Sequence, residues 1–270
     1  MNPSIRKLIR SVQSEFHFLK NAKDAFYYRT RRLRGPHEAE FHALNFIPDE
    51  LSGIYVDIGA NHGQSIESIK MLKPKAHIVS FEANDGLAKK LQSRYRGRSD
   101  VLVRAYGLSD KNDTQTLYVP VYRKFVYDGN ASLDREAATA LYNSNYLYRY
   151  DESKLELKEV VCSIKRLDDE HLTPLFMKLD VQGLEYNVLL GGQETLRTHQ
   201  PILMIEGLRD QPALVDMLKS IGYEEYYFDE TGFSRSVPFD AINQIVMTAR
   251  RAQQVTMSSR SLTEQIAPTV

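Results

Sequence analysis

Short apolar runs recur along the chain from residue 54 to residue 249, and most of them are rich in β-branched residues. Such runs are typical of buried strands when glycine or polar residues follow them. Between the runs, apolar residues recur at helical spacing instead. The pattern predicts strands at 54–58, 77–81, 101–105, 114–121, 158–164, 175–179, 201–205, 223–228 and 245–249, and helices at 37–46, 65–72, 87–95, 134–142, 186–190 and 212–221. This alternation of strands and helices favours an α/β fold.

The same pattern divides the chain into three parts. Residues 1–49 predict a basic helical arm, residues 50–250 one α/β domain, and residues 251–270, which are rich in Ser and Thr, a loose tail. Within the domain, residues 115–160 interrupt the strand–helix repeat. We expect a substrate-side insertion there, because loops on a rigid sheet usually carry specificity. Its tyrosines either offer flat faces to a sugar or cover an edge of the core: Tyr142, Tyr146, Tyr148 and Tyr150.

Basic residues dominate the first 35 positions, and the apolar residues among them fall on one helical face. A basic amphipathic helix can lie on a membrane surface. The same helix can instead pack on its own domain or on a second subunit, with its arginines in water. The sequence leaves open both peripheral membrane contact and a homo-oligomer.

Composition narrows the class of protein. The chain has 270 residues with 35 basic and 35 acidic side chains, so it can bury a substantial core, and its charge does not indicate nucleic acid. Its one cysteine, Cys162, excludes an internal disulfide and fits a reducing cytosol. No apolar run approaches the roughly 18 residues of a membrane span. Arg6, Lys7 and Arg10 interrupt the apolar stretch that a signal peptide needs. We therefore expect a cytoplasmic enzyme.

The segment 54–63, Ile-Tyr-Val-Asp-Ile-Gly-Ala-Asn-His-Gly, combines a predicted strand, a glycine turn and the start of a helix. Backbone N–H groups at such a point face a ligand. The spacing differs from the Gly-x-Gly-x-x-Gly of a dinucleotide site, because Asn61 stands where a middle glycine would be. The residues of this turn are our predicted cofactor-binding backbone: Gly59, Ala60, Asn61 and Gly63.

Two acids favour a cationic nucleoside as the ligand. Asp57 could meet the ammonium group of an amino-acid moiety, and Glu82, after the second strand, is placed for the two hydroxyls of a ribose. S-adenosylmethionine carries both groups. Ala83, Tyr106 and Ser132 complete the predicted cofactor set, although Tyr106 fits a packing role equally well. The plainer alternative is a strand–helix–strand unit whose glycines only help packing.

A second group of polar residues follows strands predicted later in the chain. Asp180 is our predicted general base, and we expect Glu206 and Glu185 to orient the acceptor hydroxyl or to hold Lys178, a charge that needs a partner inside an apolar strand. Each acid has a plainer role: Asp180 as a helix cap, Glu206 as a solvated loop acid and Glu185 as a favourable charge near a helix start. The three acids could instead hold Mg²⁺, but no His or Cys lies at a ligand spacing, and we predict no metal.

Several segments match one known family as a set. They are 56–63, 81–83, Arg-Leu-Asp-Asp at 166–169, Met-Lys-Leu-Asp-Val-Gln-Gly-Leu-Glu at 177–185 and the strand 202–206. Together they resemble the FkbM family of S-adenosylmethionine-dependent methyltransferases. The resemblance implies a class I methyltransferase fold: a Rossmann-like, mostly parallel sheet of seven strands, with helices on both faces and the last strand antiparallel. Gln182 stands where the family commonly has Glu, which weakens any metal role.

We therefore predict an O-methyltransferase that uses S-adenosylmethionine and acts on a sugar, a glycan or another small polar acceptor, as the resemblance implies. Two other classes stay open. One is a protein that binds S-adenosylmethionine without transfer activity, within a glycan assembly system. The other is a nucleotide-dependent oxidoreductase, which the missing glycine pattern argues against.

Overall fold

The computed structural model describes residues 35–229, 232–234 and 243–255, and the chain divides into two compact units. The larger unit comprises Pro36–Asp113 and Ile164–Val270. The inserted unit contains Thr114–Ser163, close to the insertion predicted at 115–160. Most of the predicted N-terminal arm, residues 1–34, lies outside the described residues.

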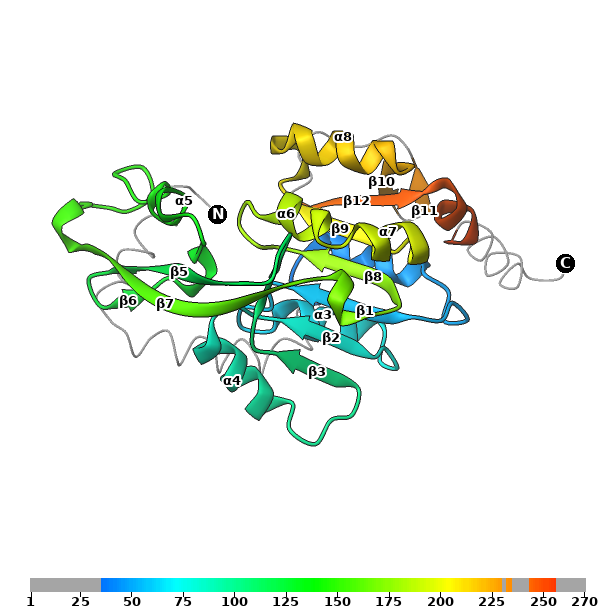
Figure 1. Ribbon diagram of the computed structural model, residues 1–270, viewed down its shortest axis with the longest axis horizontal. Coiled ribbons are helices and arrows are strands. Elements are labelled where there is room, and N and C mark those ends of the chain that lie inside the picture. Colours follow the sequence, from blue (N-terminus) through cyan, green and yellow to red (C-terminus); the bar gives the residue numbers. More distant parts are fainter. Residues whose placement is uncertain (1–34, 230–231, 235–242, 256–270) are drawn as a thin grey trace, which may run out of the picture. The chain divides into compact units, whose positions relative to one another are not determined.

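A mixed sheet forms the centre of the larger unit. Its strands are β1 (Ile54–Ile58), β2 (Ile78–Phe81), β3 (Val101–Arg104), β8 (Pro174–Leu179), β9 (Ile202–Glu206), β10 (Tyr223–Asp229), β11 (Gly232–Ser234) and β12 (Asn243–Thr248). They lie in the order β11-β10-β12-β9-β8-β1-β2-β3, and Figure 1 shows β8, β1, β2 and β3 one after another.

The predicted α/β class is confirmed, and the sheet departs from the prediction in its number of strands. Neighbouring strands from β9 to β3 are parallel, whereas β12 is antiparallel to both β9 and β10. Residues 232–234 fold back on β10 as β11, so the described part of the chain has eight strands in this sheet where seven were predicted. The predicted final pair is confirmed as β10 and β12.

Helices cover both faces of this sheet. The 3-10 helix η2 (Ala39–Phe46) and the helices α3 (Gln64–Leu72) and α4 (Asp85–Arg94) pack on one face; α6 (Glu185–Leu190), α7 (Gln193–His199) and α8 (Pro212–Ser220) pack on the other. Successive residues of a strand point to opposite faces, so Tyr55 joins the first core and Val56 the second. Because both faces are apolar, the strands read as continuous apolar runs in the sequence.

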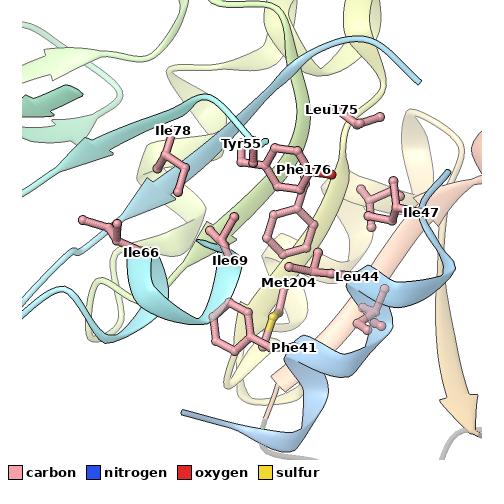
Figure 2. Close-up of a cluster of buried hydrophobic side chains, with 14 of the residues drawn as sticks. Phe41, Leu44, Ile47, Tyr55, Ile66, Ile69, Ile78, Leu175, Phe176 and Met204 are labelled. Carbon is pink, nitrogen blue, oxygen red and sulfur yellow. The ribbon is translucent and has the colours of Figure 1, made fainter. Parts of the chain in front are cut away.

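The helix predicted at 37–46 is the 3-10 helix η2, and it anchors the start of the larger unit. Phe41 and Leu44 are fully buried, and Figure 2 shows Phe41 beside Met204 of β9. Burying a side chain of this size contributes roughly 1.5–3 kcal/mol relative to leaving it exposed. This packing fixes the residues just before η2, including Glu38, on the same face of the sheet.

Two other predicted boundaries change. The helix predicted at 134–142 shortens to α5 (Arg135–Thr139), with Asp134 as its cap: the Ala137 N–H donates to Asp134 Oδ1 at 2.8 Å. Residues 249–255 are helical, with Ala252 and Val255 buried. The loose tail predicted from residue 251 therefore does not begin there, and residues 256–270 lie outside the described part of the chain.

The inserted unit has its own small core. It contains β6 (Phe125–Val126), most of β5 (Asp113–Tyr122) and of β7 (Leu155–Arg166), with the 3-10 helices η3 (Asp128–Asn130) and η4 (Glu152–Lys154) and the helix α5. Tyr122, Tyr127, Tyr142 and Leu147 are buried together there. In the larger unit, the last residues of β7 pair with β4 (Gly107–Ser109), and the 3-10 helices η5 (Asp168–Glu170) and η6 (Leu208–Asp210) complete the connections.

Candidate functional site

One face of the large sheet carries polar side chains where its parallel strands end. Asp57 of β1 lies opposite Ser80 of β2 and opposite Lys178 of β8. Paired residues of neighbouring strands point to the same face, and side chains alternate along each strand. Glu82 lies two residues beyond Ser80, and Asp180 two residues beyond Lys178, so the four charged side chains share the face that η2, α3 and α4 cover.

We call these residues, Glu82, Ser80, Asp57, Lys178 and Asp180, the polar row. The strand register extends the polar row to β9 and to the antiparallel strand β12. Lys178 pairs with Met204 of β9, and Glu206 lies two residues further on. Asn243, the first residue of β12, is the partner of Glu206. The structure thus brings together, from separate strands, the residues that the sequence placed at successive strand ends.

Asp57 is fully buried at the centre of this row. Its Oδ2 accepts a hydrogen bond from the Ser80 hydroxyl at 2.8 Å. Burial raises the pKa of Asp57 to about 6, against the opposing effects of the Ser80 hydrogen bond and the Lys178 charge. This buried carboxylate places negative charge beneath the turn that follows β1.

Glu82 holds that turn from the neighbouring strand. Its Oε2 accepts the Asn61 N–H at 2.7 Å, and its Oε1 accepts the Asn84 N–H at 2.7 Å. Asn61 itself has a φ of 48°, in the left-handed region, and its Oδ1 is buried without a hydrogen-bond partner in the described structure. Ala60 is buried and its N–H donates to the carbonyl of Phe81 at 3.0 Å.

The two glycines of the turn are needed by the protein itself. Gly59 has a φ of 89°, and a Cβ there would lie 1.9 Å from the carbonyl oxygen of Asp180. Gly63 has a φ of 86° and precedes α3, and its Cβ would lie 2.8 Å from a methyl group of Leu91. The lack of a side chain at these two positions is required by the neighbouring backbone and core side chains. The glycines therefore do not by themselves indicate a ligand.

Lys178 is the cation of the row and is almost wholly buried, with 1% of its side chain exposed. Its Nζ lies 3.5 Å from Asp180 Oδ2 and 4.0 Å from Glu38 Oε2, so these two acids supply the partners that the buried lysine needs. Burial alone would lower the pKa of Lys178, but the surrounding carboxylates, Asp180 first, raise it overall. Lys178 therefore stays charged and stabilises negative charge around it.

Asp180 and Glu206 respond to this environment in opposite ways. Burial favours the neutral form of Asp180, yet the Lys178 charge and hydrogen bonds from Glu206 and Gln182 outweigh it and lower the pKa. Burial and the adjacent Asp180 charge raise the pKa of Glu206 to about 8. The two shifts favour the ionised form of Asp180 and the protonated form of Glu206. The Asp180 side chain is 31% exposed, so it can meet a substrate.

Gln182 helps to keep Asp180 ionised. The Gln182 Nε2 donates to Asp180 Oδ1 at 2.8 Å, a hydrogen bond that an ionised Glu at this position could not donate. The departure from the family pattern that the sequence shows at residue 182 thus replaces a negative charge beside Asp180 with a donor. The suggested cap role of Asp180 is not observed, because Leu184 precedes α6 as its cap residue.

Glu185 points into its own loop. Its carboxylate accepts the Val181 N–H at 3.0 Å, the Gly183 N–H at 3.1 Å and the Gln211 side-chain amide at 2.7 Å. It is the first residue of α6 and is buried. The structure therefore places Glu185 as a support of the loop after β8.

Other predicted residues lie elsewhere. The Tyr106 ring packs against Phe81 in the core of the opposite face, and its hydroxyl donates to Glu170 Oε1 at 2.8 Å. Ser132 belongs to the inserted unit, where its Oγ accepts the Asp134 N–H at 3.1 Å. Ala83 lies in the loop between Glu82 and α4.

Two residues of the row were missed by the sequence reasoning: Glu38 and Asn243. Glu38 lies 140 positions before Lys178, ahead of an apolar helix, and Asn243 opens a strand. A usable signal was Lys178 itself, because a buried lysine in an apolar strand requires more than one counter-charge. The signal does not say where in the chain the second acid lies.

The inserted unit gives its tyrosines a packing role. Tyr142 is 5% exposed and its ring meets those of Tyr127 and Tyr146 edge-on, while Tyr150 stacks on Tyr122. This agrees with the prediction that they cover a core. Tyr148, in contrast, is 49% exposed.

No group of three or more His, Cys, Asp or Glu side chains in residues 35–229, 232–234 and 243–255 is arranged to hold a metal ion. In the same residues, every helix is too short or too polar to cross a lipid bilayer.

Comparison with known proteins gives two relatives by sequence. The AMB antimetabolite synthetase AmbE of Pseudomonas aeruginosa is 29% identical over 203 residues, which cover 63% of this chain and 9% of AmbE. The 2-O-methyltransferase NoeI of Sinorhizobium fredii is 25% identical over 181 residues, which cover 62% of this chain and 71% of NoeI. The chain thus spans only a small part of the first relative and most of the second.

Solved structures give weaker likenesses. The methyltransferase FkbM of Methylobacillus flagellatus KT has 15% identity and a TM-score of 0.44, over 83% of this chain and 50% of that one. An rRNA methylase of Streptococcus thermophilus has 11% identity and a TM-score of 0.38, over 77% and 92%.

The Methyltransferase FkbM domain matches residues 57–233. The match begins at Asp57 and includes Glu82, Lys178, Asp180 and Glu206. It covers more than half of the chain, and the chain therefore belongs to the FkbM methyltransferase family.

Proposed function

We propose that the protein transfers a methyl group from S-adenosylmethionine to a hydroxyl group of a sugar or another small polar acceptor. Membership of a methyltransferase family supports the reaction class. The relative whose name states 2-O-methyltransferase supports oxygen as the atom that is methylated. The strand order, with β12 antiparallel beside β9, supports the class I sheet that the sequence resemblance implied.

The observation that carries the proposal is the polar row on one face of the sheet. At one end, Glu82 lies at the tip of β2, where a carboxylate suits the two hydroxyls of a ribose. Asp57 is fully buried, so it would act through its charge, which favours a cation at the turn above it. These two residues fit the two polar ends of S-adenosylmethionine.

The other end of the row supplies a base. S-adenosylmethionine brings a methyl group already activated on a sulfonium, so the acceptor oxygen must be held about 3 Å from the methyl carbon and must lose its proton. Asp180 is ionised and partly exposed, and it accepts that proton as the O–CH₃ bond forms and the S–CH₃ bond breaks. Lys178 compensates the negative charge of Asp180 before transfer.

Glu206 and Glu185 take supporting parts in this proposal. Glu206 is neutral near pH 7 and shares its proton with Asp180, which fixes the orientation of the base. Glu185 holds the loop from Val181 to Gly183 and so sets the position of the backbone that follows Asp180. We assign Glu185 a positioning role and no direct part in proton transfer.

Calorimetry with S-adenosylmethionine, S-adenosylhomocysteine and NAD tests the cofactor. We expect binding of the first two and none of NAD. Incubation with labelled S-adenosylmethionine and a panel of sugar acceptors then tests transfer. Binding of NAD alone would overturn the proposal in favour of an oxidoreductase, and binding of S-adenosylmethionine without transfer to any acceptor would favour a non-catalytic binding protein.

A further inference from the structure

Buried polar atoms with only long or poorly aligned polar contacts gather beside Asp180. They are Glu38 Oε2, Lys178 Nζ and both amide atoms of Asn243. An unsatisfied buried polar group costs about 1–3 kcal/mol, and native proteins keep few of them. Three such side chains in one place therefore call for an explanation.

The three side chains belong to one cluster. Lys178 Nζ lies 4.0 Å from Glu38 Oε2. Asn243 pairs with Glu206 across the β9–β12 ladder, on the face of the sheet that carries Lys178. Burial raises the pKa of Glu38 overall, against the opposing effects of the Lys178 charge and of a side-chain hydrogen bond with Asn243. The residues come from three distant parts of the chain, so local geometry alone does not account for their meeting.

Two side chains of the cluster are buried, and the two carboxylates beside them are partly exposed. Lys178 and Asn243 are 1% and 2% exposed, whereas the side chains of Glu38 and Asp180 are 21% and 31% exposed. The two accessible carboxylates thus flank a lysine and an amide that lie beneath them. Phe41 packs beside Met204 in Figure 2, and this contact holds the residue three positions earlier, Glu38, over the same face.

The chemistry of the cluster selects a hydroxyl group. Glu38 offers an acceptor, Lys178 a donor, and Asn243 one of each kind. A hydroxyl both donates and accepts, so it can satisfy these atoms together. An anionic group fits poorly, because three acids, Glu38, Asp57 and Asp180, surround the single lysine.

We propose that Glu38 and Asn243 bind a second hydroxyl group of the methyl acceptor, adjacent to the hydroxyl that Asp180 deprotonates. The acceptor is then a sugar or another polyol with neighbouring hydroxyls. This inference rests on the proposed function of the same site. The inference adds to the proposed function a requirement for two hydroxyls on the acceptor, and it names Glu38 and Asn243 as the residues that bind the second hydroxyl.

Thermal unfolding of Asn243→Leu without ligands gives a readout that is independent of activity. Replacing a poorly satisfied buried amide by an apolar side chain of similar size is neutral or stabilising. We therefore expect an unchanged or higher melting temperature together with weaker acceptor binding. A purely structural role would show the reverse, a lower melting temperature with unchanged binding, and would overturn the assignment of Asn243.

The acceptor requirement is tested with labelled S-adenosylmethionine and a panel of methyl glycosides of common hexoses, pentoses and 6-deoxyhexoses, with cyclohexanol as the single-hydroxyl control. For any glycoside that is methylated, the derivative lacking the neighbouring hydroxyl should show a KM about 10-fold to 100-fold higher in the wild type. In Glu38→Gln and Asn243→Leu that difference should shrink to near unity. Glu40→Gln, two residues along the same segment, should behave as the wild type.

The outcomes separate this inference from the function beneath it. If S-adenosylhomocysteine binds but no glycoside is methylated, or if cyclohexanol serves as well as the sugars, the two-hydroxyl requirement is wrong and the cofactor assignment stands. If the KM for the deoxy derivative is raised as much in both variants as in the wild type, other residues bind the second hydroxyl. If S-adenosylhomocysteine does not bind, both proposals fail.

Discussion

Asp57 and Asp180 lie near the ends of neighbouring strands of one sheet, on the same face and close to Lys178, yet their pKa values are shifted in opposite directions. Asp57 is fully buried and its pKa is raised to about 6; the Asp180 side chain is 31% exposed and its pKa is lowered. Lys178 lowers both pKa values. Only at Asp180, where Lys178 lies 3.5 Å away and Glu206 and Gln182 add hydrogen bonds, do these effects together outweigh burial.

The difference shows how one lysine can serve two carboxylates in distinct roles. At the Asp57 end the charge is closed off beneath a turn, where it can favour a cation without meeting the acceptor. At the Asp180 end the charge reaches the surface, beside a neutral Glu206 that shares a proton with it. The same residue type therefore marks a binding end and a reacting end of the row.

The largest effect that would sharpen this comparison is expected from Asp180→Asn. An amide cannot accept the hydroxyl proton, so kcat should fall by about 10²-fold to 10⁴-fold with unchanged affinity for S-adenosylhomocysteine. Steady-state kinetics and calorimetry measure the two quantities. Asp216→Asn, at an exposed position of α8, is the control. Wild-type turnover in Asp180→Asn with unchanged affinity would remove Asp180 as the base.

Lys178→Met removes the cation that the two ends share. Because it leaves buried carboxylates without a counter-charge, we expect a loss of about 3–5 kcal/mol in the free energy of unfolding near neutral pH. The loss should shrink at pH 5, where the carboxylates with raised pKa values become neutral. Urea unfolding at both pH values measures it. An equal loss at the two pH values would mean that packing, and not charge, is the role of Lys178.

Gly59→Ala tests whether the turn after β1 must pack directly against the backbone of Asp180. The new Cβ meets the Asp180 carbonyl oxygen, whereas Gly97, with a similar φ of 81°, has nothing within 4 Å. Gly97→Ala should cost only the left-handed strain, about 1–2 kcal/mol. Gly59→Ala should cost more than that and should also lower activity. Equal unfolding free energies for the two variants would show that the turn after β1 can yield.

Glu82→Gln weakens the binding end. Loss of a charged acceptor for the ribose hydroxyls should reduce affinity for S-adenosylhomocysteine about 10-fold to 100-fold. Calorimetry checks this, with Glu50→Gln at an exposed position as the control. Affinity equal to that of the wild type would separate Glu82 from the cofactor and leave it only its backbone hydrogen bonds.

The smallest effect is the pH dependence that Glu206 gives to stability. Its pKa is raised from 4.5 to about 8, so between those values the folded protein holds more protons than the unfolded chain, and stability falls as pH rises. One linked proton changes the free energy of unfolding by about 1.4 kcal/mol per pH unit at most. From pH 6 to pH 8, above the value for Asp57, Glu206→Gln should flatten this decline. An identical slope in the variant would contradict the shared proton.

The sequence predicted much of the row because strand ends can be recognised locally. Asp57, Glu82, Asp180 and Glu206 each follow or end an apolar run, and parallel strands bring such residues to one edge. The α/β class follows from the same runs. These predictions needed only the period of the pattern and the direction of the strands.

The remainder depended on contacts that no local pattern records. Glu38 reaches Lys178 only because η2 packs on the sheet, and the role of Glu185 depends on how its loop closes after β8. Tyr106 was assigned from its position alone. Its packing against Phe81 places it on the opposite face, which alternation along β3 could have indicated.

The junctions of the inserted unit lie side by side in the larger unit. Gly107–Ser109 pairs with Ile164–Arg166, and the Asn112 side chain bonds both the Arg166 N–H and Asp169. The two segments that connect the inserted unit to the larger unit are therefore hydrogen-bonded to each other. Because these flanking segments pair within the larger unit, we expect that residues 114–163 can be replaced by another sequence while the sheet that carries Asp57 and Asp180 stays folded.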